Sequence, residues 1–160
     1  MIFQYTWPEV VTKRKTVTRR IIAPGEYAIR TKYNRIASVK HNGRVKWCVG
    51  KTYAVQPGRG QKQVARIKLT RITSEKLSRI SNHEARAEGF TDRQEFLRTW
   101  EEIHGSDMLE CRVWVLEFKL VDLMPSLMHL TFSMDSVQFL REIGLKNDNI
   151  RFDHTWSGMS

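Results

Sequence analysis

Lys15 and Thr18 are the residues whose types and spacing could carry out hydrolysis. They lie in the stretch TKRKTVTRRI, residues 12–21, which places five basic residues and three threonines in ten positions. A neutral lysine can take the proton of a nearby hydroxyl, which is otherwise a poor nucleophile. The pKa of such a lysine must fall well below its usual value of about 10.4, and the like charge of the basic neighbours acts in that direction. The stretch could therefore hold a lysine base and a threonine nucleophile, although a basic run of this kind is also typical of a solvated face or a polyanion-binding patch.

The spacing of Lys15 and Thr18 sets a condition on the backbone. Residues three apart share one face of a helix but point to opposite faces of a strand. The two side chains can cooperate only if the chain turns between them, and the end of a short helix predicted over residues 8–14 would provide that turn. The alternative interpretation makes Lys15 a phosphate contact and Thr18 an ordinary strand residue.

Nearby aromatic and basic side chains are candidates for binding a substrate. Trp7, beside the start of the predicted helix, could stack on a nucleobase, a contact worth roughly 1–3 kcal/mol in single-strand binders. Packing in the core is an equally good interpretation of Trp7. Arg19 and Arg20 should project to different sides of a strand, one toward the pocket and the other into solvent. Three further tryptophans are assigned to the core: Trp47, Trp100 and Trp114.

The first half of the chain must supply the elements that position these residues. Pro8 favours the first turn of a helix, and the β-branched and basic alternation after Thr16 is typical of a half-exposed strand. The polar segment containing HNGR is predicted to be a loop or a mobile hairpin. The predicted elements are a strand over 1–6, the helix over 8–14, a strand over 16–22, the loop over 30–46 and two strands within 46–73.

The second half changes from strand to helix at Ser74. Short helical pieces are predicted over 74–81 and 81–90, and a longer helix follows with Thr91 as its N-cap, Gln94 at the capping-box position and Gly105 as its end. A final strand is predicted over 111–121. This order indicates a small mixed β-barrel or sheet with helices over one opening. A further helix over 133–144 divides the chain into a domain of residues 1–122 and an extension of residues 123–160.

Composition restricts the compartment and the partners. No apolar run reaches the roughly 18 residues that span a bilayer, so we expect a cytoplasmic protein without membrane contact. The formal net charge of +10 favours a nucleic acid or a nucleotide as partner.

Cys48 and Cys111 form no CxxC pair and are predicted to be buried thiols, and the five histidines lack metal-ligand spacing. The segment GRVKWCVGKT has the wrong glycine spacing for a phosphate-binding loop. We expect neither a metal nor a cofactor.

Several segments, in this order, resemble the ASCH family of PUA-like domains. They are KTVTRR, VGKTYAVQPGRG with VARIKLTRI, ISNHEARAEGF before FLRTWEEIHG, and the closing VWVLEFKLV, which together extend over roughly residues 1–122. The resemblance implies an α+β fold, a PUA-like small mixed β-barrel with helices over one opening. It also implies a cleft that binds RNA or modified nucleotides. The chain is longer than the small bacterial members before Trp47 and at its C-terminus, so its pocket can differ from theirs.

The resemblance also implies an activity and its residues. Small bacterial ASCH proteins are amidohydrolases that remove the acyl group from N(4)-acetylcytidine, with a lysine and a threonine in a Lys-Thr-x-Thr run and a glutamate downstream. These positions correspond to Lys15, Thr18 and Glu88, with Glu84 as a competing candidate for the acid. Glu88 would orient the lysine or pass a proton to the leaving amine. The expected substrate is a modified nucleoside or base. A competing function is an RNA-binding module, or an ASCH-type ribonuclease, that uses the same basic cleft.

Overall fold

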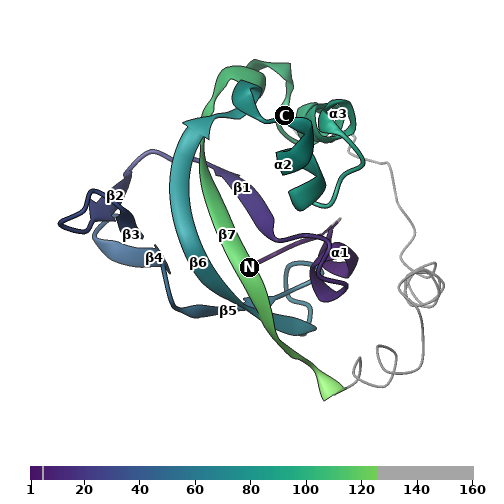
Figure 1. The fold of residues 1–160 in the computed structure, drawn as a ribbon, viewed down its shortest axis with the longest axis horizontal. Coiled ribbons are helices and arrows are strands. Elements are labelled where there is room, and N and C mark those ends of the chain that lie inside the picture. Colours follow the sequence, from purple (N-terminus) through teal and green to yellow (C-terminus); the bar gives the residue numbers. More distant parts are fainter. Residues whose placement is uncertain (5, 126–160) are drawn as a thin grey trace, which may run out of the picture.

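The computed structural model describes residues 1–4 and 6–125 as a mixed α+β domain with two antiparallel sheets and few helices. In Figure 1 the long strands β6 and β7 run through the middle, with the sheet of β2, β3 and β4 on their left and the helices on their right. The four-stranded sheet has the order β1-β7-β6-β5 and the three-stranded sheet has the order β2-β3-β4. Within the described ranges the strand pairing gives these two sheets, and a closed barrel is not shown.

The N-terminal residues do not form the predicted strand. Ile2 makes one isolated parallel bridge with Gln56, and helix α1 (Trp7–Val11) begins directly afterwards. Pro8 lies in the first turn of α1, as expected from its fixed φ, but the helix is shorter than predicted. The chain then turns at Lys13, whose φ is 62°, and enters strand β1 (Val17–Ile21).

The segment predicted to be a loop forms most of the three-stranded sheet. Strand β2 (Glu26–Arg30), which was not predicted, pairs with β3 (Ile36–His41), and β3 pairs with β4 (Arg44–Cys48). Asn42 and Gly43 connect β3 to β4 with φ values of 48° and 79°, the left-handed turn that an Asn-Gly pair favours. The hairpin interpretation of this segment was therefore correct and the loop interpretation was wrong.

Strands β5 (Thr52–Val55), β6 (Ala65–Lys76) and β7 (Arg112–Leu123) complete the four-stranded sheet. Strand β6 continues to Lys76, so the helix predicted from Ser74 is wrong, and only a short 3-10 turn follows (Leu77–Arg79). The pairing explains this extension, because β7 hydrogen-bonds β6 along its whole length and fixes residues 74–76 as strand. Strand β7 ends at Leu123, one residue beyond the predicted domain boundary.

The helical region between β6 and β7 agrees with the prediction, except at the caps. Helix α2 (Asn82–Ala87) begins with a capping box between Ser81 and Glu84. Helix α3 (Arg93–His104) is capped by Asp92 instead of Thr91, and the Thr91 amide donates to Glu95 instead of Gln94. A second 3-10 turn (Ser106–Glu110) leads into β7. Gly105 ends α3 as predicted, with a φ of 88°.

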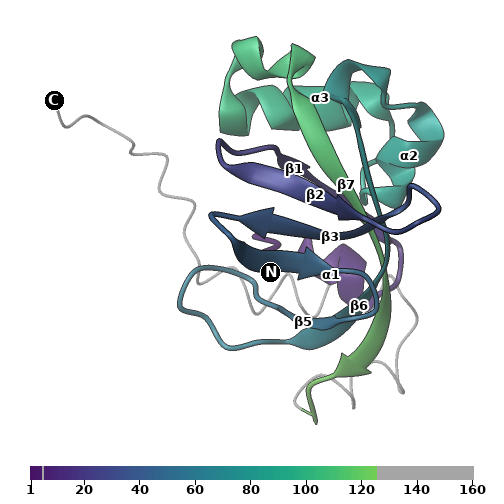
Figure 2. The same cartoon turned by 90° about the vertical axis from the view of Figure 1, so that its left-hand side faces the viewer.

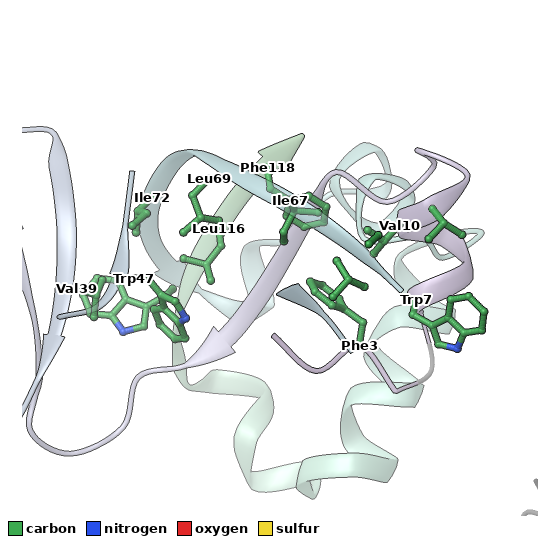
Figure 3. Close-up of a cluster of buried hydrophobic side chains, with 14 of the residues drawn as sticks. Phe3, Trp7, Val10, Val39, Trp47, Ile67, Leu69, Ile72, Leu116 and Phe118 are labelled. Atoms are coloured by element: carbon green, nitrogen blue, oxygen red, sulfur yellow. The ribbon is translucent and has the colours of Figure 1, made fainter. Parts of the chain in front are cut away.

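Two apolar clusters hold the domain together. The larger one lies between the two sheets and α1 and includes Trp47 and Trp114, and Figure 3 draws Trp7 at its α1 end. The smaller one packs α3, through Phe96 and Trp100, against the ends of β1 and β7. The three tryptophans assigned to the core are therefore buried as predicted. Cys48 and Cys111 are half-buried free thiols, less buried than predicted.

Two expectations concern the membrane and the C-terminal extension. Among the described residues no helix combines the length and the apolar composition that a bilayer crossing needs. The helix predicted over 133–144 lies outside the described residues. Figure 2 views the same domain from the side of the three-stranded sheet, with α3 above it.

Candidate functional site

A hollow of about 220 Å³ lies where the N-terminal segment before α1, strand β1, the end of α2 and helix α3 meet. We call it the Lys15 hollow. The predicted residues Lys15, Thr18, Arg19, Arg20 and Glu88 all line it. Its lining also contains aromatic side chains, and we call Phe90, Phe96, Trp100 and His104 its aromatic wall. Charged and aromatic side chains in one hollow suit a small ligand that is both flat and polar.

A buried ion pair forms the floor of the hollow. The Lys15 Nζ lies 2.5 Å from the Glu88 Oε2 and also donates to the Glu88 backbone carbonyl at 2.6 Å. Both side chains are only 3% exposed, so the pair is almost fully removed from water. Burying two charges costs hydration free energy that their mutual attraction only partly offsets. A buried ion pair is therefore weak evidence for stability and a reason to look for a function.

Arg19 ties Glu88 to two further carboxylates. Its side chain is fully buried and contacts Glu75 at 2.7 Å, Glu84 at 3.1 Å and Glu88 at 3.2 Å. The two oxygens of Glu88 therefore have different partners, one Lys15 and the other Arg19. This arrangement fixes the plane of the Glu88 carboxylate and leaves Arg19 with little capacity to bind a substrate directly.

Thr18 reaches the same hollow from strand β1. Its side chain is 4% exposed, and its strand position pairs with Leu116 of β7. The turn that brings Lys15 to the same side occurs at Lys13, before Lys15 and not between the two residues as predicted. Within residues 1–4 and 6–125 no hydrogen bond joins Lys15 to Thr18. Both side chains line one hollow, and their chemical roles stay predictions.

The end of α2 places Glu88 against Lys15. Glu88 is the C-cap, and Gly89 follows with a φ of 92°. The Gly89 amide donates to Arg86 and the Phe90 amide donates to Ala85, the hydrogen-bond pattern of a Schellman motif. A Cβ on Gly89 would lie 3.0 Å from the Glu9 Cβ and 3.5 Å from the Lys15 Cβ. The glycine therefore allows both the left-handed turn and the close approach of α2 to α1.

The titration of the site follows from its burial. Removal from water lowers the pKa of the Lys15 ammonium, and the Glu88 carboxylate opposes this effect without cancelling it. Arg20 and Arg19 add like charge that also lowers it. Burial alone would raise the pKa of Glu84, but hydrogen bonds from Ser81 and the charge of Arg19 hold it below its usual range. Lys15 is therefore shifted toward the neutral form that a base requires.

The glutamates are distinguished by their contacts. Glu88 contacts Lys15, whereas Glu84 contacts Ser81 and Arg19 and is far more exposed. Glu75, which sequence reasoning missed, joins the network because β6 continues past Ser74. The alternation of buried and exposed residues along β6 ends at Ile72, so the local sequence contains no signal for Glu75, which is in a strand because it pairs with Val113 of β7.

The substrate-binding candidates divide differently from the prediction. Trp7 is buried in the larger core and is not among the residues that line the hollow, so its position supports the packing interpretation. Arg19 and Arg20 both line the hollow instead of one facing solvent. Arg20 is half-buried, donates to the Ile2 carbonyl and lies over the Phe3 ring.

The aromatic side chains of α3, which sequence reasoning assigned to the core alone, also line the hollow. In the part of the chain that the structure describes, no group of ligating side chains could hold a metal.

Comparison with known proteins gives only distant structural similarity. No family model matches the sequence, and no curated protein matches it. A protein of the family model DUF984 from Enterococcus faecalis V583 is 18% identical with a TM-score of 0.47, over 73% of this chain and 70% of that one. An ASCH domain from Lactobacillus crispatus JV V101 is 16% identical with a TM-score of 0.47, over 71% of this chain and 69% of that one. This similarity does not establish a shared family, so the function must follow from the site itself.

Proposed function

We propose that the protein is an amidohydrolase that removes the acyl group from N(4)-acylated cytosine or cytidine compounds. The observation that carries the proposal is the dry Lys15–Glu88 pair beside the Thr18 side chain in one hollow. The resemblance of the ordered sequence segments to ASCH amidohydrolases gives the same three residues, and we include the ASCH, PUA-like fold in the proposal.

The reaction would proceed through an acyl-threonine. The Thr18 hydroxyl attacks the carbonyl carbon of the acyl group while its proton passes to neutral Lys15. The bond between that carbon and N4 then breaks, and Lys15 returns the proton to the leaving amine. A water molecule next attacks the acyl-threonine ester, which releases the carboxylic acid and restores Thr18. Glu88 acts on Lys15, which it holds in place on the floor of the hollow.

The size and lining of the hollow support a small substrate. Its volume of about 220 Å³ is below the roughly 300–1,000 Å³ typical of sites for drug-sized ligands, so one acylated base suits it better than a polymer. The aromatic wall offers Phe90 and Trp100 to the face of the base. Arg20, whose side chain donates a hydrogen bond to the Ile2 carbonyl, can also contact a polar oxygen of the substrate.

The proposal is tested by following cytidine release from N(4)-acetylcytidine with the purified protein. Lys15→Ala, Thr18→Ala and Glu88→Gln should each remove most of the activity, because residues that act as one unit are strongly non-additive. Thr18→Ser should retain part of it, since a hydroxyl remains. Thr99→Ala is the matched control, because Thr99 lines the same hollow from α3 and has no role in the proposed chemistry.

Two outcomes would contradict the proposal. Activity that survives Thr18→Ala but is lost in Glu88→Gln would mean that water is the nucleophile and Glu88 its base. No turnover of any acylated cytosine by the unmodified protein would remove the enzyme hypothesis. Circular dichroism of each variant would separate loss of chemistry from loss of fold.

The net charge of +10 favours a second candidate, an RNA-binding module that breaks no bond. In that case RNA would occupy the same Lys15 hollow. No hydrolysis by the unmodified protein, together with RNA binding that Lys15→Ala weakens, would favour the module over the enzyme.

A further inference from the structure

A second and larger cleft, of about 860 Å³, opens between the three-stranded sheet and strand β6. We call it the arginine cleft, because Arg30, Arg35 and Arg71 line it from the end of β2, the turn after β2 and the middle of β6. It shares no lining residue with the Lys15 hollow. In Figure 1 the three-stranded sheet lies on one side of β6 and β7 and the helices lie on the other, so the two sites open on different parts of the domain.

The charge of the arginine cleft is of one sign. None of the described residues that line it is acidic, and the hydroxyls of Thr31, Thr70, Thr73 and Ser74 add further donors. The nearest acidic partner is Glu117, which lies 3.4 Å from Arg71 in an exposed contact. Exposed ion pairs of this kind contribute little to stability. Arg71 can therefore leave Glu117 and bind a more highly charged anion. Three guanidinium groups with hydroxyl donors form a site suited to phosphate groups.

The later half of β6, which lines the same cleft, pairs with a strand on one side only among the described residues. Strand β5 pairs with β6 only over Ala65–Lys68, so within the described ranges the later half of β6 has β7 on one side and no strand on the other. A register shift between Leu69 and Arg71 leaves Thr70 unpaired at this point. Bulges at such positions redirect side chains and free backbone groups beside binding sites.

The turn after β2 presents an aromatic ring beside these charges. Tyr33 is 73% exposed, and its neighbour Lys32 lies 5.0 Å from the ring centroid. The turn is held in one conformation, because the Thr31 hydroxyl accepts from the amides of Tyr33 and Arg35 and the Arg30 guanidinium donates to the Asn34 carbonyl. An exposed ring on an ordered turn loses little entropy when a base stacks on it.

We infer that the arginine cleft and the exposed ring of Tyr33 bind single-stranded nucleic acid, with the phosphates on the arginines and an unpaired base on Tyr33. A free phosphate would use the arginines and leave Tyr33 without a role. A duplex would leave no base free to stack. The site differs from the Lys15 hollow, so the strand can bind whether or not the protein hydrolyses acylated cytosines.

The test is fluorescence anisotropy of the full chain with a labelled, unstructured oligonucleotide of about 10 nucleotides. Tyr33→Ala should weaken binding roughly 5- to 150-fold, the equivalent of about 1–3 kcal/mol, while Tyr33→Phe should bind nearly as well as the unmodified protein. Arg35→Gln should reduce the slope of log affinity against log salt by roughly 0.7, the effect of one lost phosphate contact. Arg35 suits this purpose because the structure records no side-chain hydrogen bond for it within the described residues.

Arg59→Gln is the matched control, because Arg59 is also exposed but lies in the loop between β5 and β6, outside the cleft. If Arg59→Gln weakens binding as much as Arg35→Gln, net charge alone explains the binding and the inference is wrong. Binding that depends on Lys15 instead of Tyr33 would move the strand to the Lys15 hollow and overturn it. Titrations with RNA and DNA strands of the same sequence show which of the two nucleic acids the cleft prefers. A duplex that binds as tightly as either single strand would exclude stacking on Tyr33 and overturn the inference.

Discussion

At the scale of single residues, the proposed site depends on the protonation of Lys15, which forms a buried ion pair with Glu88. Lys15 has to be neutral to act as a base, and its burial supplies that shift, whereas Glu88 favours the charged form. The two effects oppose each other on the same nitrogen, 2.5 Å from the carboxylate. Burial thus lowers the pKa of Lys15 although the carboxylate opposes the shift, and perturbed pKa values of this kind are common in active sites.

The pH dependence of stability tests this account. The folded-state pKa of Lys15 is lowered below its usual 10.5, so between the two values the unfolded chain holds a proton that the folded chain has released. Stability must then rise with pH through that window and level off above it. The free energy of unfolding in urea, measured at increasing pH, should rise for the unmodified protein relative to Lys15→Met. Lys13→Met, two residues away and exposed, is the matched control.

If the free energy of unfolding of the unmodified protein falls with pH relative to that of Lys15→Met, the attraction of Glu88 exceeds the cost of burying Lys15. Lys15 would then be held charged and could not serve as the base. The proposed mechanism would lose its proton acceptor, although the hollow itself would remain.

The sequence was sufficient to select Lys15, Thr18 and Glu88 but not to describe their surroundings. A motif specifies residue types at fixed spacing, and these three do line one hollow. The contacts of Arg19 with three glutamates could not be predicted, because they join positions 56 to 69 residues apart in the chain. Trp7 was a candidate for stacking on a base because it lies near the motif in sequence. Nearness in sequence does not determine the side to which a ring packs, and Trp7 packs into the larger core.

At the scale of elements, Gly89 sets the distance between α2 and α1. Gly89→Ala should destabilise the protein by more than the roughly 1–2 kcal/mol of left-handed strain, because its Cβ would also lie 3.0 Å from the Glu9 Cβ. The movement that relieves this contact would displace Glu88, so hydrolysis of N(4)-acetylcytidine should fall as well. Urea unfolding and the activity assay measure the two effects.

Gly50→Ala is the matched control for that substitution. Gly50 has a similar φ of 84°, but a Cβ there would meet no atom within 4 Å. The difference between the two variants isolates the close packing of α2 on α1 from the backbone strain. Equal destabilisation of both would contradict the role assigned to Gly89.

The elements that were predicted well are those with a local signal. The end of α3 at Gly105 depends on a few adjacent residues and was predicted, whereas the predicted cap of α3 was one residue off and the capping box of α2 was not predicted. Strand β2 and the last residues of β6 were missed because partners distant in sequence determine them. Ser74–Lys76 form a strand because β7 pairs with them, although the local residues SEK favour a helix just as well.

At the scale of the whole molecule, the two sheets separate two kinds of site. The Lys15 hollow is small and balanced in charge, since carboxylates surround Arg19. The arginine cleft is larger, and its lining in the described chain has no acidic residue. Binding of an anionic strand to the cleft should therefore depend on ionic strength, and a measurement that varies salt can separate the two sites.

Salt should affect the two sites differently in the same preparation. N(4)-acetylcytidine carries no phosphate, so its binding in the Lys15 hollow releases no counterions, and its kcat/KM should change little between about 50 and 200 mM salt. A single-stranded oligonucleotide should bind far more weakly over the same range, because each phosphate contact contributes roughly 0.7 to the slope. Parallel steady-state assays and anisotropy titrations measure both quantities. A steep loss of nucleoside turnover with salt would contradict the separation, since it would require ionic contacts with the substrate inside the hollow.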